Sequence, residues 1–285
     1  MLDQAQRLRE LVNNENEAGS PRIITVTSGK GGVGKSNFVV NLSISLQKLG
    51  KKVLIFDADM GMANDDVLMG FLPKYNIFDI IFKEKSLEEV LVEGPYGVKL
   101  LPGGTALSKV DGMTEEERQN FLGKIKKLKG VDYIIIDTGA GINRDVLGFI
   151  ACSDNLVLVI TPEPTSLTDS YSLLKAVSYF KVKSSASVVV NRIIDEKEGK
   201  ITFEKLRNTA SYFLKIDIKL LGFIAEDRKL IKSVRSQMPI VIGYPNSIAA
   251  MDIKNIAGKV IGYKSDKNSC SNIEKFFNKL FNIFS

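Results

Sequence analysis

The feature that most constrains the fold is a glycine-rich segment, GKGGVGKS, which runs from Gly29 to Ser36. It follows the apolar run IITVTS, which begins at Ile23, and it precedes a stretch with helical periodicity that reaches about Leu49. Glycines in such a turn let successive backbone N–H groups point at one anion, and the helix N-terminus adds its positive end. The spacing in this context predicts a phosphate-binding loop rather than an ordinary glycine turn.

Most residues of this loop are expected to contact the phosphates of a nucleotide. Lys35 should neutralise the β- and γ-phosphates, and Ser36 should ligate Mg²⁺. Lys30 adds a second lysine, which by itself could equally be a solvated loop residue. The contact residues predicted from this segment are Gly31, Gly32, Val33, Gly34, Lys35, Ser36 and Asn37.

Histidine is absent from the 285 residues, and the two cysteines, Cys152 and Cys270, stand far apart without a CxxC spacing. Mechanisms that need an imidazole are therefore excluded, including Ser-His-Asp triads, Cys-His dyads and His-containing zinc sites. The net charge of +6 is spread along the chain, which indicates a mildly basic surface rather than a nucleic-acid footprint. No signal-peptide pattern and no apolar run of about 18 residues is present, so we expect a cytoplasmic protein, free or on a membrane surface.

Short apolar runs typical of parallel strands recur along the chain, each separated from the next by room for a helix. A length of 285 residues with 44% apolar content is enough for one α/β domain. Thr114 and Glu117 have the spacing of a capping box ahead of a helix whose inward stripe is Phe121, Ile125 and Leu128. The predicted fold class is α/β, a mostly parallel twisted sheet with helices on both faces, with strands after the first at residues 53–56, 98–101, 133–136, 156–160, 188–190 and 220–224.

Carboxylates end two of these runs. Asp57 and Asp59 close the second strand two residues apart, so their side chains share a face if the segment is extended. Asp137 ends the run at residues 133–136, and we expect it to hold a metal-bound water. Both strand ends lie at the carboxyl edge of the predicted sheet, where open α/β folds bind ligands. An acid pair at a strand end is also common in helix caps and turns, so that alternative stays open for Asp57 and Asp59.

With both lysines, the loop contains KGGVGKS and resembles that of the deviant Walker A ATPases, which include MinD, ParA and the nitrogenase iron protein. The resemblance implies a P-loop NTPase fold of the SIMIBI-like type, with ATP or ADP and Mg²⁺ as cofactors. It implies that Lys30 reaches across a dimer interface to the partner subunit's nucleotide, and that Asp59 positions the attacking water. It also implies that Asp57 assists the Mg²⁺ shell, so the metal-site residues are Ser36, Asp57 and Asp137 and the catalytic residues are Lys30, Lys35 and Asp59.

Further segments match the same family. Residues 138–142 resemble its switch II. In MinD-like proteins an Asn that follows a strand such as residues 188–190 reads adenine, which implies this role for Asn191. Ala225 stands where relatives commonly carry Pro, and this departure affects the base contact. The residues that the resemblance places on the adenine side are Asn191, Arg192, Glu226 and Asp227.

Several stretches narrow the resemblance, which spans residues 22–262, to flagellar-number regulators of the FlhG (FleN, YlxH) type. They are residues 57–64, 101–104 and 161–169. Asp65 is less typical of this subgroup, and we expect a small effect from it. At the N-terminus, the segment DQAQRLR from Asp3 to Arg9 resembles the element with which FlhG proteins stimulate the GTPase of FlhF, their signal-recognition-particle-type partner.

The two ends of the chain are predicted as short helices outside the ATPase domain. Residues 1–20 would be a partner-activating helix and linker, 21–265 the P-loop ATPase domain, and 266–285 an amphipathic helix. The last helix carries Lys275 and Lys279 beside one apolar face. This face could pack on the domain as part of the core, or insert beside anionic lipid headgroups, as we expect in the ATP dimer. Its members are Ile273, Phe276, Phe277, Leu280, Phe281 and Phe284.

These features predict an ATPase that forms a homodimer when ATP-bound and regulates flagellar number and placement from the inner face of the cell membrane. Expected partners are an FlhF-type GTPase and the anionic membrane, with flagellar switch-complex proteins as further candidates and no nucleic acid. A MinD-type division-site regulator and a ParA-type DNA-segregation ATPase are the alternatives. A metal-cluster carrier is disfavoured because no paired cysteines lie near residues 138–142.

Overall fold

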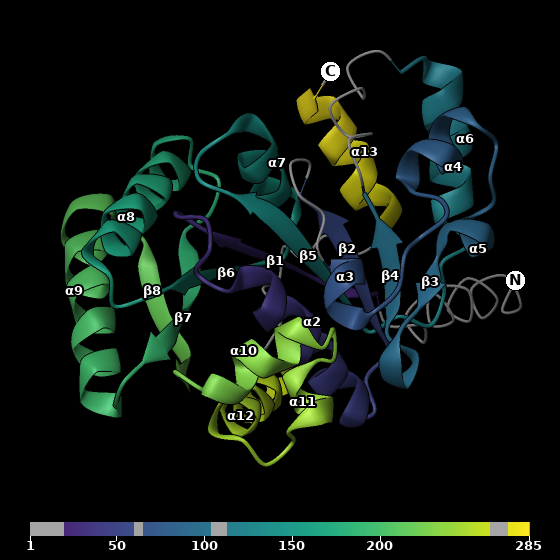
Figure 1. The fold of residues 1–285 in the computed structure, drawn as a ribbon. Coiled ribbons are helices and arrows are strands. Elements are labelled where there is room, and N and C mark those ends of the chain that lie inside the picture. The colour runs from purple at the N-terminus through teal and green to yellow at the C-terminus, as the bar shows by residue number, and fades with distance from the viewer. Residues whose placement is uncertain (1–19, 60–64, 104–112, 263–272, 285) are drawn as a thin grey trace, which may run out of the picture.

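A single sheet organises the computed structural model, which describes residues 20–59, 65–103, 113–262 and 273–284 (Figure 1). The sheet has eight strands in the order β3-β4-β2-β5-β1-β6-β7-β8, and only the β3–β4 pair is antiparallel. This confirms the predicted α/β class. The strands are β1 Arg22–Ser28, β2 Val53–Ala58, β3 Val92–Glu93, β4 Lys99–Pro102, β5 Tyr133–Ala140, β6 Asn155–Ile160, β7 Ser185–Ile193 and β8 Asp217–Ala225.

Helices cover both faces of this sheet because alternate strand residues enter different apolar clusters. Ile24 of β1 lies in a cluster with α2 and α12, whereas Ile23 lies in the cluster with α6, α7 and α13 on the other face. Helices α8 and α9 continue that second face beyond β6. The helices are α2 Lys35–Lys48, α3 Asp65–Met69, α4 Ile77–Phe82, α5 Leu87–Val90, η1 Pro95–Gly97, α6 Glu115–Ile125, α7 Arg144–Cys152, α8 Pro164–Tyr179, α9 Glu196–Leu214, α10 Arg228–Arg235, α11 Ile240–Gly243, α12 Ile248–Gly262 and α13 Ile273–Phe284.

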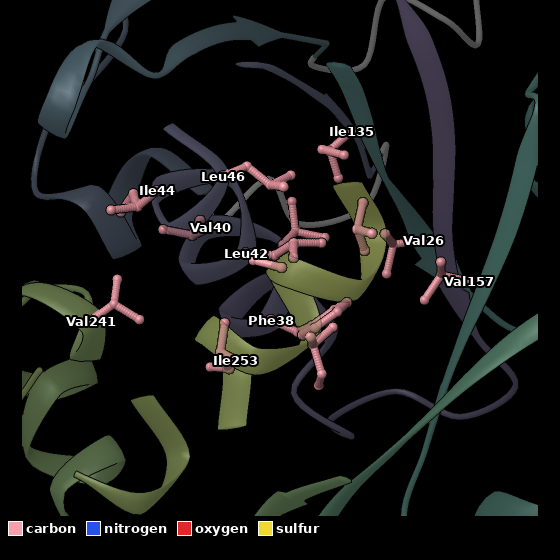
Figure 2. Close-up of a cluster of buried hydrophobic side chains, with 14 of the residues drawn as sticks. Val26, Phe38, Val40, Leu42, Ile44, Leu46, Ile135, Val157, Val241 and Ile253 are labelled. Carbon is pink, nitrogen blue, oxygen red and sulfur yellow. The ribbon is translucent and has the colours of Figure 1, made fainter. Parts of the chain in front are cut away.

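Helix α2, which directly follows the glycine loop, is buried along most of its length between the sheet and α12. Figure 2 shows Phe38 and Leu42 of α2 among the side chains of this cluster, with Val26 of β1 and Ile253 of α12. Each such side chain contributes about 1.5–3 kcal/mol when fully buried. The loop at the start of α2 is therefore attached to one of the most firmly packed helices.

The capping box predicted ahead of α6 is confirmed. The Glu117 N–H donates to the Thr114 hydroxyl at 3.2 Å, and the Thr114 N–H donates to the Glu117 carboxylate at 2.8 Å. Phe121 and Ile125 are buried, and Leu128 packs against the same cluster. The helix therefore begins where local capping satisfies its first N–H groups.

The C-terminal helix α13 packs between α6 and α7 (Figure 1). Phe277 contacts the rings of Phe56 and Phe121, with centroid distances of 5.5 and 5.0 Å. Polar contacts surround this apolar core: Arg118 donates to the backbone oxygen of Asn278 at 2.9 Å. In this conformation the helix therefore adopts the docked alternative, and its buried members are Ile273, Phe276, Phe277, Leu280 and Phe281.

No helix in the described part of the chain has the length and apolar character needed to cross a bilayer. The N-terminal segment from Asp3 to Arg9 lies outside the described residues, and so does Cys270.

Candidate nucleotide site

The candidate site lies at the carboxyl edge of the central strands. Strand β1 ends at Ser28, where the glycine loop begins, and Asp57 of β2 lies directly opposite Asp137 of β5 in the strand register. Gly103, after β4, donates its N–H to the Asp57 backbone oxygen at 2.8 Å. Parallel strands bring these ends together, so residues far apart in the sequence meet at one edge.

At the inner end of the loop, residues 34–36, the Lys35 side chain is buried and paired. The Lys35 Nζ donates to the Asp137 carboxylate at 2.5 Å, and these side chains are 8% and 2% exposed. The Ser36 hydroxyl donates to the same carboxylate. The structure thus brings together three residues predicted for phosphate and Mg²⁺ contacts.

Burial perturbs the carboxylates beside this pair. It raises the pKa of Asp57 to about 7, with a further contribution from the charge of Asp137. The Asp57 carboxylate accepts the Asp59 N–H at 3.2 Å, and it also accepts the N–H of Asp65. Asp65 is completely buried, and burial raises its pKa well above the usual range. The site therefore holds more carboxylates than cations.

The glycines of the loop leave space that side chains would fill. A Cβ added at Gly31 or Gly32 would meet no atom within 4 Å, and Gly32 has a φ of +78°. At Gly29 a Cβ would lie 2.3 Å from the backbone of Asp169, so the loop packs directly on α8. The open positions suit a phosphate group next to backbone N–H groups, which is the arrangement that the sequence predicts.

The outer end of the loop, residues 29–31, is more exposed and has a different partner. The Lys30 Nζ donates to the Glu163 carboxylate at 2.6 Å and to the Thr165 hydroxyl at 2.9 Å. Lys30 and Glu163 are 37% and 52% exposed. The hydrogen bond from Lys30 lowers the pKa of Glu163. Lys30 is therefore held at the surface, away from Asp137.

Asp59 lies beside residues 138–142, the segment that resembles switch II. It is half-buried, and its Oδ1 lies 3.5 Å from where a Cβ would stand on Gly139. A Cβ at position 139 would therefore make ordinary van der Waals contact with this carboxylate. The structure places Asp59 beside the site, as the sequence predicts, and its role in orienting water stays a prediction.

The residues predicted on the adenine side already have protein partners. The Asn191 amide donates to the Val33 backbone oxygen at 2.8 Å, and its oxygen accepts the Arg192 N–H at 3.0 Å. The Asp227 carboxylate accepts the N–H of Lys229 at 2.8 Å and so caps helix α10, so the contact observed for this side chain is a structural one. Arg192 and Glu226 are exposed nearby. Their contacts with a base stay predictions.

The sequence did not identify Glu163, Thr165 or Asp65 as members of the site. Glu163 and Thr165 lie inside residues 161–169, a stretch that the sequence marks for family likeness only. Nothing local indicates that they meet Lys30, 133 and 135 residues away. The sequence marks Asp65 only as less typical of the subgroup, and no local signal indicates that its side chain is fully buried.

The chemistry of these residues suits a nucleotide with Mg²⁺. Within the described residues, no group of three or more His, Cys, Asp or Glu side chains is arranged to hold a metal by itself. Mg²⁺ is usually held by one or two carboxylates together with phosphate oxygens and water, so a nucleotide is expected to complete the site. The residues predicted to hold the metal with it are Ser36, Asp57 and Asp137.

Comparison with known proteins agrees with this geometry. A family model described as an AAA domain matches residues 21–190. The antiactivator FleN of Pseudomonas aeruginosa is 33% identical over 260 residues, which are 91% of this chain and 93% of FleN. The chain belongs to the MinD/ParA-type P-loop ATPases. As a member of this family it is an ATPase that uses ATP or ADP with Mg²⁺.

Other relatives of this ATPase support the same assignment. The flagellum site-determining protein YlxH of Helicobacter pylori is 36% identical, covering 92% of this chain and 91% of YlxH. MinD in the MinC:MinD complex of Aquifex aeolicus has a TM-score of 0.69 at 29% identity, covering 86% of this chain and 97% of that one. MinD of Pyrococcus horikoshii, solved with Mg-ADP, has a TM-score of 0.67 at 25% identity, covering 84% and 96%.

Proposed function

We propose that this ATPase is a nucleotide-controlled dimeric switch that regulates flagellar number and placement. The observation that carries the proposal is the similarity to FleN and YlxH over about nine-tenths of each chain. The geometry supports the switch in two places: the surface lysine at the outer end of the loop, and the docked C-terminal helix.

The hydrolytic step uses the inner end of the loop. Lys35 would leave Asp137 to contact the phosphates, and Ser36, Asp57 and Asp137 would hold the metal and its water. Asp59 orients the attacking water from the side of Gly139. Bound Mg²⁺ supplies positive charge that offsets the charge of the phosphates. The remaining contribution is positioning by a loop that is fixed to the buried helix α2.

Dimerisation uses the outer end. Lys30 exchanges Glu163 and Thr165 for the phosphates of the partner subunit's nucleotide. Such an exchange is feasible because the Lys30–Glu163 pair is half-exposed and therefore contributes little by itself. ATP, with its additional phosphate, favours this exchange more than ADP.

The C-terminal helix couples the nucleotide state to the membrane. Its apolar face is covered by α6 and α7, so lipid can bind it only after release from the domain. The groove on the domain and the membrane bury the same side chains, and each large one contributes about 1.5–3 kcal/mol in either place. The free energies of the docked and the membrane-bound helix therefore differ by far less than the total free energy of burial in either place. Two released helices in a dimer bind together with a large gain in effective concentration. A modest change on dimerisation can therefore switch attachment.

Co-sedimentation with phosphatidylglycerol-containing liposomes tests this switch. We expect pelleting with a slowly hydrolysed ATP analogue and not with ADP. Arg118→Ala removes a domain contact to α13 without changing the apolar face, and should pellet with either nucleotide. Arg207→Ala, on the distant helix α9, is the matched control and should behave as wild type. Equal pelleting of the wild-type protein in both states would reject the switch.

The segment from Asp3 to Arg9 is proposed to stimulate an FlhF-type GTPase. It lies outside the described residues, and its resemblance to the FlhG element supports the proposal. A peptide of residues 1–20 should stimulate such a GTPase. Deleting residues 1–12 should abolish stimulation and leave ATP hydrolysis unchanged, and stimulation by the deleted protein would contradict the assignment.

A MinD-type division-site regulator is the second candidate. MinD of Synechocystis is 32% identical over 248 residues, and the Aquifex structure shows MinD with MinC. Binding of a MinC-type protein by the ATP dimer, together with no stimulation of an FlhF-type GTPase, would favour this function. The ParA family ATPase of Chlorobium tepidum, at 22% identity and a TM-score of 0.67, shows the fold alone.

A further inference from the structure

Asp65 is the one described carboxylate with both oxygens buried and without a hydrogen-bond partner. It opens helix α3, in the first turn, and its relative exposure is 0%. Burying a polar group without a hydrogen bond costs about 1–3 kcal/mol or more. A group placed at such a cost often has a ligand that supplies the missing contact.

The surroundings of Asp65 indicate what that ligand is. Its N–H donates to Asp57, and Asp57 lies opposite Asp137 on the neighbouring strand. The Lys35 Nζ donates a hydrogen bond to the Asp137 carboxylate at 2.5 Å, and so it offsets the negative charge of one of these carboxylates. Three carboxyl groups with one ammonium form a buried cluster that lacks positive charge.

A hydrated divalent cation supplies this missing positive charge better than another side chain does. Carboxylate oxygens and water are the ligands that Mg²⁺ prefers, and groups behind the direct ligands hold its waters in place. The cluster adjoins Ser36, whose hydroxyl donates to Asp137. Asp65 thus lies next to Asp57, one of the residues predicted for the metal.

We propose that Asp65 is an additional carboxylate of the magnesium site, acting with Asp57 and Asp137 on the hydrated metal that accompanies the nucleotide. Burial alone disfavours the ionised form of this carboxyl group, and a bound cation stabilises that form, so Asp65 makes nucleotide binding by this chain strongly dependent on Mg²⁺. The inference depends on the ATPase assignment and not on the flagellar role.

Nucleotide titration with and without metal tests the proposal. The dissociation constant of a fluorescent ADP is measured in excess Mg²⁺ and in EDTA, for the wild-type protein and for Asp65→Asn. The variant should lower the ratio of the EDTA value to the Mg²⁺ value by about tenfold or more, as for other groups behind metal ligands. Asp66→Asn is the matched control, since Asp66 is the next residue and only partly buried; its ratio should stay as in wild type.

Mn²⁺ binding gives a second measurement that does not depend on hydrolysis. Electron paramagnetic resonance of free Mn²⁺ in the presence of ADP should show affinity about tenfold weaker for Asp65→Asn. Thermal unfolding verifies that the variant is folded, and Asp65→Ala serves if it is not. An unchanged ratio, or an equal loss of affinity with and without Mg²⁺, would overturn the proposal, because a purely structural role predicts either result.

Discussion

The two ends of the glycine loop place their lysines in opposite environments. Lys35, at the inner end, is 8% exposed and pairs with a carboxylate that is also buried, whereas Lys30, at the outer end, is 37% exposed and pairs with a surface glutamate. The partner of Lys35 belongs to the nucleotide site of its own subunit. The partner of Lys30 belongs to the start of α8, where solvent or a second subunit can reach it. One motif therefore supplies a binding lysine and a lysine available to another molecule.

Removing the inner lysine should have the largest effect. Lys35→Ala should weaken ATP binding by at least about 100-fold, because hydrogen bonds between charged groups contribute about 1.5–3 kcal/mol each. The variant also leaves Asp137 without its cation. Titration with a fluorescent ATP analogue measures this, with the exposed Lys175→Ala as control. Affinity close to wild type would remove Lys35 from the phosphate site.

Replacing Asp59, which lies beside the inner end of the loop, should affect turnover alone. Asp59→Ala should keep nucleotide affinity and lower phosphate release by about 100-fold, which is typical when a group that positions or deprotonates water is lost. If Lys35→Ala loses binding and Asp59→Ala loses only turnover, the inner end of the loop is assigned to nucleotide binding. Hydrolysis at the parental rate would show that another group orients the water.

The outer lysine should affect association rather than binding by one subunit. Lys30→Ala should weaken ATP-dependent dimerisation by about tenfold, or about 1.4 kcal/mol, with a smaller loss of nucleotide affinity in the monomer. Light scattering with a slowly hydrolysed ATP analogue measures the dimer. Normal dimerisation would mean that Lys30 is an ordinary loop residue and that the two ends do not differ in function.

The smallest effect should come from Glu163. Glu163→Gln removes the charge that holds Lys30 in its own subunit, so dimerisation with ATP should strengthen by about two- to fivefold, the range for an exposed ion pair. Glu204→Gln breaks a comparable exposed pair on α9 and is the control. Weaker dimerisation of Glu163→Gln would indicate that Glu163 acts in the interface instead.

The pH dependence of the same variant checks the ion pair. Lys30 lowers the pKa of Glu163 below its ordinary value of 4.5, so the stability it contributes is present above pH 4.5 and is lost as the pH falls through the lowered pKa. The difference in Tm between wild type and Glu163→Gln should therefore shrink as the solution is acidified below this value. A difference that grows on acidification would contradict the pairing.

Much of the fold follows from local pattern. The predicted strands at residues 53–56 and 133–136 lie within β2 and β5, and the Thr114–Glu117 spacing marks the start of α6. These signals are local because periodicity and capping depend on neighbours a few residues away. The two-residue strand β3 was missed, since so short an edge strand has no periodicity of its own.

The C-terminal helix shows what the local sequence pattern could not predict, namely the surface against which the helix packs. Its apolar stripe is equally compatible with lipid and with a groove on the domain, and only α6 and α7 decide in favour of the groove in this conformation. The decision rests on shape: Phe277 meets Phe56 and Phe121 at ring distances typical of packed cores.

By itself, the sequence determined the α/β class, the phosphate loop and the carboxylates at the strand ends, because each depends on residue types at short, fixed spacings. Tertiary structure alone decided that Lys30 meets Glu163, that Asp65 is buried next to Asp57, and that α13 is docked. These contacts join segments far apart in the chain or depend on how completely a side chain is covered. Their free energies come from packing and desolvation, which no local spacing encodes.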